Sequence, residues 1–191
     1  MKISATKEDA QRILESYKAR IHVEFDNGQL RLNGLPILWA RAELQYNIYR
    51  ELENLIGDSA HSVIKRIAKP YGVSFCKLME QGFVKSGEKA SRNDMLKDLC
   101  AENLAIGWGR IELEDKEGEL VVSSKTGFPV GQEYKARASK SKRAVDSYFL
   151  GYMEGFLSTL DSTSYVGEET ECMGKGDPRC VMVFKKAPGA K

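Results

Sequence analysis

Several common signatures of catalytic function are missing from this sequence of 191 residues. It contains no Gly-x-Gly-x-x-Gly loop for a dinucleotide and no phosphate-binding loop. No candidate nucleophile has a neighbouring base, so nothing in the pattern indicates a hydrolase. These absences favour a protein that is not an enzyme.

A strong net charge and long apolar runs are missing as well. The chain holds 29 lysine and arginine residues against 27 acidic ones, a formal charge of +2, which creates no strong field for a nucleic acid or a membrane surface. The basic run Lys135–Arg143 is interleaved with small residues, which is typical of a solvated segment. No apolar run reaches membrane-spanning length, and Met1–Arg20 is polar rather than signal-like. We expect a cytoplasmic protein with no membrane span and no nucleic-acid partner.

Histidine and cysteine are both scarce. His22 and His61 are the only two histidines, and the spacing of their apolar neighbours places each on the surface. Four cysteines without a secretory signal indicate a reducing compartment, where metal binding or free thiols are expected rather than disulfides. Cys76 and Cys100 lie in apolar patterns and are expected to be core thiols.

The sequence does contain enough apolar residues for one compact domain with a short extension, since 42% of it is hydrophobic. A near capping box, Thr6–Asp9, predicts an amphipathic helix within residues 1–20. Alternation predicts hairpins at about 21–32 and 107–124, and Lys125–Tyr134 has no regular pattern. Apolar spacing predicts further helices at about 41–56, 60–70, 71–79, 91–103 and 144–160.

The C-terminal segment Tyr165–Phe184 has the composition of a β-hairpin with a long turn, since apolar runs flank a loop with glycines and an Asp-Pro. Cys172 and Cys180 stand at the two ends of the loop, and Glu169 lies three residues before the first. Two thiols and a carboxylate brought together by a hairpin would supply most of a tetrahedral zinc site. A cross-strand disulfide, two inert thiols and a solvated Glu169 are the open alternatives.

The motif Glu169-x-x-Cys172-x7-Cys180, after Gly-Tyr-x-x-Gly-Phe at 151–156, resembles the end of the 4-vinyl-reductase-type domain. The same module is similar to the N-terminal effector domain of activators that respond to phenols and xylenes. The likeness covers about residues 24–186. Further segments that carry it are Leu30–Leu38, Leu55–Asp58, Ala60–Gly72 and Gly107–Glu112.

This resemblance implies an α/β (α+β) fold, an antiparallel β-sheet packed against a helical layer, similar also to subunits of vesicle-tethering transport particles. It implies a structural zinc ion held by Glu169, Cys172 and Cys180. The fourth ligand of the phenol-responsive relatives is a cysteine, and its place falls near Asp146, whose carboxylate is a competent zinc ligand. Those activators use a histidine against the phenol hydroxyl, and no histidine follows His61 here, so phenol itself is not expected.

Three classes of function follow from the resemblance. A sensor-type domain would enclose an apolar, aromatic or lipid-like molecule between the helices and the sheet. The alternatives are an assembly or scaffold subunit and an accessory protein of tetrapyrrole metabolism related to vinyl reductases. We favour the sensor. Its candidate lining, which on spacing alone also fits a plain core, is Tyr71, Phe75, Trp108, Tyr148, Tyr152 and Phe156.

The resemblance also implies a homodimer. The expected contact is the N-terminal helix around Ile13, Leu14 and Tyr17 together with the first hairpin, because a short amphipathic helix gains most by burying its apolar stripe. We expect three parts: a helix at 1–20, the ligand-binding domain at 21–186 and a tail at 187–191. No DNA-binding or ATPase segment is present, so a sensor would act on a separate downstream protein partner.

Gly151 and Gly155 lie inside the helix predicted at 144–160, where each glycine costs about 1 kcal/mol relative to alanine. We interpret this cost as a sign that something approaches the helix backbone closely. Either a neighbouring helix or a bound ligand would explain it.

Overall fold

A computed structural model describes residues 1–38, 40–85, 87, 89–116 and 118–188. Trp39, parts of two expected turns and the end of the expected tail lie outside the described residues. The elements follow in the order β1 (Lys2–Ser4), α1 (Lys7–Arg20), β2 (Ile21–Glu24), β3 (Gln29–Leu32), β4 (Leu35–Ile37), α2 (Ala42–Ile56), α3 (Ser59–Lys85), α4 (Arg92–Ala105), β5 (Glu112–Lys116), β6 (Glu119–Ser124), α5 (Pro129–Ala136), α6 (Ser147–Leu160), β7 (Tyr165–Glu171), η1 (Met173–Lys175) and β8 (Cys180–Lys186).

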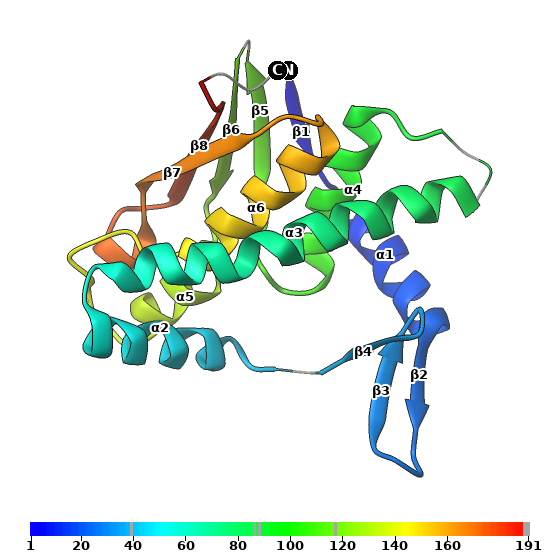
Figure 1. The fold of residues 1–191 in the computed structure, drawn as a ribbon, viewed down its shortest axis with the longest axis horizontal. Coiled ribbons are helices and arrows are strands. Elements are labelled where there is room, and N and C mark those ends of the chain that lie inside the picture. Colours follow the sequence, from blue (N-terminus) through cyan, green and yellow to red (C-terminus); the bar gives the residue numbers. More distant parts are fainter. Residues whose placement is uncertain (39, 86, 88, 117, 189–191) are drawn as a thin grey trace.

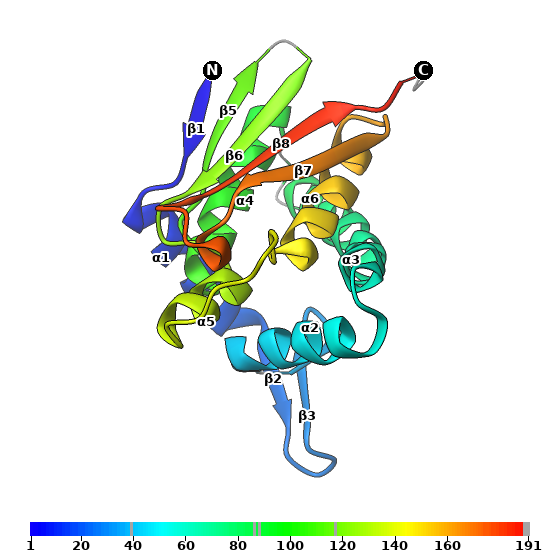
Figure 2. The same ribbon diagram turned by 90° about the vertical axis from the view of Figure 1, so that its left-hand side faces the viewer.

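A five-stranded antiparallel sheet forms one layer, and helices cover one of its faces (Figures 1 and 2). Its strands lie in the order β1-β5-β6-β8-β7. Buried residues alternate with more exposed ones along β6 and β7, which is the pattern of a sheet with one face on the core. The expected α+β class, an antiparallel sheet packed against a helical layer with an N-terminal helix, is confirmed.

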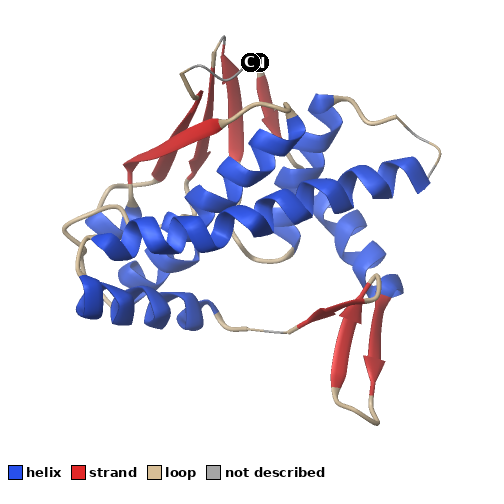
Figure 3. Cartoon of the chain, viewed as in Figure 1, coloured by secondary structure: helices blue, strands red, loops and turns tan. Residues whose placement is uncertain are grey.

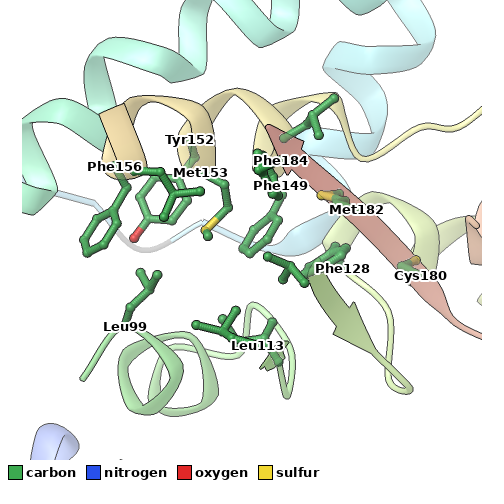
Figure 4. Close-up of a cluster of buried hydrophobic side chains, with 14 of the residues drawn as sticks. Leu99, Leu113, Phe128, Phe149, Tyr152, Met153, Phe156, Cys180, Met182 and Phe184 are labelled. Carbon is green, nitrogen blue, oxygen red and sulfur yellow. The ribbon is translucent and has the colours of Figure 1, made fainter. Parts of the chain in front are cut away.

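The core lies between this sheet and helices α4 and α6 (Figure 4). The residues labelled there are Leu99, Leu113, Phe128, Phe149, Tyr152, Met153, Phe156, Cys180, Met182 and Phe184. Cys76 and Cys100 are buried free thiols, as expected.

The first residues of the chain belong to the sheet rather than to the N-terminal helix. Ile3 of β1 pairs with Leu113 of β5, and the Met1 amino group donates to the Asp115 carbonyl at 2.7 Å. A strand of three residues carries too little alternation to be recognised in a sequence. The capping box of Thr6 at the start of α1 is present, and Ile13 of α1 is buried in the core of its own chain.

Helix α3 is continuous from Ser59 to Lys85, so the predicted end near Pro70 is wrong. A proline inside a helix removes one hydrogen bond and strains the preceding turn. Here α3 packs on α6 on both sides of Pro70, which offsets that cost. Helix α5 was not predicted at all, although Pro129 at its first turn is a common helix start.

The glycines of the α3–α6 contact are explained by helix packing. A Cβ on Gly151 would lie 2.1 Å from the Lys65 carbonyl oxygen, and one on Gly155 would lie 2.1 Å from that of Lys69. On the other helix, a Cβ on Gly72 would lie 1.9 Å from the Tyr152 carbonyl oxygen. The sequence left open whether a neighbouring helix or a bound ligand approaches the backbone at Gly151 and Gly155. The approaching group is the neighbouring helix α3.

The strands β2, β3 and β4 form a separate three-stranded sheet that projects from the body (Figure 3). Phe25 at its turn is 89% exposed, and Leu38 after it is 75% exposed. The expected apolar stripe of α2 also faces outward in part, since Leu55 is 70% exposed. Tyr49 of α2 is instead the residue that is buried. Several large apolar side chains of this region are therefore exposed.

The glycine contact predicts opposite effects for two alanine substitutions. Gly155→Ala should destabilise the chain by about 1–3 kcal/mol, because its Cβ meets backbone atoms that cannot move independently. The matched control is Gly82→Ala on α3, where nothing lies within 4 Å and alanine should add about 0.5–1 kcal/mol. Urea unfolding of both variants measures the difference. Equal free energies of unfolding for the Gly155→Ala and Gly82→Ala variants would contradict the packing explanation.

Candidate functional site

Four buried residues with metal-binding side chains meet at the end of the sheet. Asp146 directly precedes α6, Glu169 lies in β7, Cys172 follows β7, and Cys180 begins β8. One ligand atom from each lies within 4.8 Å of the others. The structure thus brings together all the residues that the sequence proposed as metal ligands, including the one from outside the hairpin.

Local backbone geometry holds the two cysteines in this position. A bulge between Glu169 and Glu171 shifts the register of β7, and η1 then turns the chain. The Cys172 amide donates to the Asp177 carboxylate at 2.7 Å. The Met173 amide donates to Cys180 Sγ at 3.3 Å, which is the kind of contact that stabilises a thiolate. The hairpin therefore places both sulfur atoms on its inner side.

Asp146 lies at the centre of the cluster. Its Oδ1 accepts from the Gly131 amide at 2.9 Å, and its Oδ2 accepts from the thiols of Cys180 at 3.4 Å and Cys172 at 3.7 Å. Its own amide donates to Glu169 Oε2 at 3.1 Å, which leaves Glu169 Oε1 buried with no hydrogen-bond partner in the described part of the chain. An unpartnered buried oxygen beside two thiols is the arrangement expected around a cation.

The pKa shifts of the four side chains also indicate a site for a cation. Burial raises the pKa of Asp146, and burial together with the charges of Asp146 and Cys172 raises the pKa of Glu169 well above its usual range. The hydrogen bond between the thiols lowers the pKa of Cys172 and raises that of Cys180. Acidic groups in such a site must either keep protons or share a cation.

Two of the alternatives left open by the sequence do not hold. Cys172 and Cys180 are free thiols and form no disulfide. Glu169 is only 8% exposed, so it is not a solvated residue. A hollow of about 300 Å³ opens beside it and is lined also by His61 and Arg143.

His61 is half-buried rather than a plain surface residue. Its Nδ1 lies 2.5 Å from Ser147 Oγ at the start of α6. Burial, and after it the charges of Lys65 and Arg143, lowers the pKa of His61, which favours the neutral ring. The contact joins α3 to the same end of α6 at which Asp146 lies.

The aromatic side chains proposed as a ligand lining also come together. Trp108 lies at centroid distances of 5.3 Å from Tyr152 and 5.8 Å from Tyr148. Tyr71 lies 5.8 Å from Tyr152, and Phe75 lies 5.8 Å from it. Phe156 completes the group at 6.2 Å from Phe75. We call these six residues the aromatic cluster.

Sequence reasoning missed one residue beside the aromatic cluster, Glu102 of α4. It is only 5% exposed, and its charge acts on Tyr152. Burial raises the pKa of Glu102 to about 8. A glutamate in a helix is usually solvated, so nothing in the sequence distinguishes this one.

The fold is similar to that of the phenol-responsive sensory domain of the transcription activator PoxR, solved with phenol. The TM-score is 0.73 at 20% sequence identity, over 96% of this chain and 92% of that one. The expected resemblance to such effector domains is therefore confirmed at the level of the fold. No family model and no curated protein matches the chain.

Two other solved structures are more distant. One is a trafficking protein particle complex subunit 3 from Naegleria fowleri, covalently bound to palmitic acid, with a TM-score of 0.46 at 14% identity over 78% of this chain and 97% of that one. The other is a vinyl-4-reductase family protein from Methanocaldococcus jannaschii, with a TM-score of 0.38 at 17% identity over 81% and 99%. At these scores neither supports a conclusion about function. None of the described helices is long and apolar enough to cross a membrane.

The raised pKa of Glu102 predicts how stability depends on pH. Between its ordinary value of 4.5 and about 8, the folded chain holds a proton that the unfolded chain has released, so stability falls as the pH rises through this window. Glu102→Gln removes this loss. The variant should gain roughly 2–3 kcal/mol relative to wild type between pH 5 and pH 8. Urea unfolding of both proteins at pH 5 and pH 8 measures this gain. If the free energy of unfolding of the variant differs from that of wild type by the same amount at both pH values, the pKa of Glu102 is not raised.

Proposed function

We propose that the chain is a sensor-type domain that binds an apolar, aromatic or lipid-like small molecule and contains a structural zinc ion. The observation that carries the proposal is the position of α6. This helix begins next to Asp146 and bears Tyr148, Tyr152 and Phe156 of the aromatic cluster. A ligand at the cluster and a metal at the hairpin would therefore act on the same rigid element.

Zinc suits the donor set of the buried cluster. Two thiolates favour zinc over calcium and magnesium, which prefer oxygen ligands alone. Asp146, Glu169, Cys172 and Cys180 would together carry the same formal charge as a structural site of four cysteines. All four are buried and come from the protein, which is the pattern of a closed structural site rather than a catalytic one.

The ligand site of this proposal is the aromatic cluster. Tyr152 and Phe156 are buried, whereas Tyr71 is 47% exposed and forms the outer side. Small-molecule sites are mostly apolar and aromatic with a few polar anchors, which this group provides. The similarity to a phenol-responsive sensory domain supports this reading. The scaffold and tetrapyrrole alternatives rest on no specific feature of the site.

The proposal includes a homodimer, a cytoplasmic location and a separate downstream partner. Ile13 is buried in its own chain, so we place the proposed dimer contact on the projecting three-stranded sheet and α2 instead of on α1. Phe25, Leu38 and Leu55 supply exposed apolar surface there. Sedimentation at micromolar concentration should show a dimer, and a monomer would remove this part of the proposal.

Zinc content tests the metal site directly. Native mass spectrometry and elemental analysis should find one zinc per chain in wild type and none in Cys172→Ser, because a serine hydroxyl is a poor zinc ligand. The matched control is Cys100→Ala, which removes a buried thiol outside the cluster and should keep the metal. A chelator and acid pH should both release zinc and lower the thermal midpoint. Full zinc content in Cys172→Ser would end the proposal.

Binding of hydrophobic compounds tests the ligand site. Aromatic compounds should raise the thermal midpoint of wild type and quench Trp108 fluorescence. Tyr148→Ala should weaken binding about two- to tenfold, as expected for the loss of one ring contact. Tyr46→Ala, which removes a ring that packs on Tyr134 instead, should leave binding unchanged. A screen without any thermal shift would favour a scaffold over a sensor.

A further inference from the structure

The two cysteines of the candidate metal site stand opposite each other on neighbouring strands. Glu171 of β7 pairs with Val181 of β8, so the register continued by one residue places Cys172 opposite Cys180. Cys172 keeps an extended backbone, with φ −142° and ψ 124°, so the strand geometry reaches this residue. Opposed residues of an antiparallel pair have Cα atoms about 4.5–5.5 Å apart, within the range of about 4.4–6.8 Å that a disulfide spans.

The sulfur atoms of these two residues are close to each other as well. Both thiols donate to the same oxygen, Asp146 Oδ2, at 3.4 Å from Cys180 and 3.7 Å from Cys172, and the two sulfur atoms lie within 4.8 Å of one another. Both are free thiols, so the structure shows the reduced form of the pair. Because the strand register already suits a disulfide, closing the remaining gap requires rotation of the side chains rather than a change of the fold.

The loop that joins the two cysteines decides how a small oxidant reaches them. Both cysteines are fully buried. The residues between them form a single 3-10 turn, η1, and then a surface segment in which Gly176 is exposed and the side chain of Arg179 is 47% exposed. A short irregular segment of this kind opens at a lower free energy than the whole domain unfolds. Local opening of this loop therefore admits a molecule as small as hydrogen peroxide while the core stays folded.

We propose that Cys172 and Cys180 are a site of reversible oxidation, at which hydrogen peroxide converts the two thiols to a disulfide. The peroxide oxidises one thiol to a sulfenic acid and releases one water molecule. The sulfur of the other cysteine then attacks the sulfenic sulfur, the S–S bond forms, and the hydroxyl group leaves as a second water molecule. The two thiols together lose two electrons and two protons, and both oxygen atoms of the peroxide end as water. A dithiol reductant reverses the reaction by thiol–disulfide exchange.

This inference rests on the proposed function and adds a form of regulation to it, because the same two sulfur atoms are the proposed zinc ligands. Zinc binds thiolates, so a disulfide removes two of the four proposed ligands at once and releases the ion. Asp146 and Glu169 then stay buried without a cation, which costs free energy. Asp146 directly precedes α6, so oxidation at the hairpin acts on the helix that carries Tyr152 of the aromatic cluster.

The test treats the zinc-loaded chain with hydrogen peroxide and follows free thiols, released zinc and a peptide map. Thiols counted in denaturant should fall from four per chain to two, while the zinc bound to the chain is released. Trypsin cleaves after Lys175 and Arg179, so the disulfide should join the peptide that contains Cys172 to the one that contains Cys180. Dithiothreitol with added zinc should restore both thiols and the bound metal.

The matched control is Cys100→Ala, which removes a buried thiol from α4 and should leave the linked peptides and the zinc release unchanged. Cys180→Ser should give no linked peptides. Sulfinic or sulfonic acid at Cys172 without linked peptides would overturn the inference, and so would a disulfide that involves Cys76 instead. If zinc is present and stays bound during oxidation, the inference fails while the proposed metal site stands. If wild type holds no zinc, the proposed metal site fails, and the peptide map of the metal-free chain still decides whether the disulfide forms.

Discussion

The backbone contact between α3 and α6 is the constraint on which the rest of the structure depends. Gly151 and Gly155 let α6 lie directly against the carbonyl groups of α3. A partly buried ion pair fixes the same contact, because Glu154 Oε1 lies 2.6 Å from Lys65 Nζ and accepts from the Gly167 amide of β7 at 2.7 Å. The position of α6 in turn places Asp146 in the buried candidate metal site with Glu169, Cys172 and Cys180, and Tyr152 in the aromatic cluster.

The candidate metal site and the surroundings of the aromatic cluster share one physical feature. Each buries an acidic side chain: Glu169, whose Oε1 has no hydrogen-bond partner among the described residues, and Glu102, whose pKa burial raises to about 8. Such groups lower stability unless they bind something, so they are unlike the rest of the core.

The sequence predicted those features that depend on local chemistry. The Thr6 capping box and the Cys172–Cys180 hairpin are local, and Asp146 was reached through a family resemblance. The errors come from tertiary packing. Pro70 lies inside a helix that stays continuous while it packs on its neighbour, and Glu102 looks like any surface glutamate because its burial depends on distant residues.

The order of strands in the main sheet has a consequence for how the chain folds during synthesis. β1 is made well before β5, with which it pairs, and β8 is made after β7 but lies between β6 and β7. The sheet therefore cannot close until β8 has left the ribosome, and α3 must wait for α6 before its glycine face is covered. Non-local pairing of this kind slows folding and exposes apolar surface in the meantime. Nascent chains of this domain should therefore depend on chaperones more than a helical bundle of the same length would.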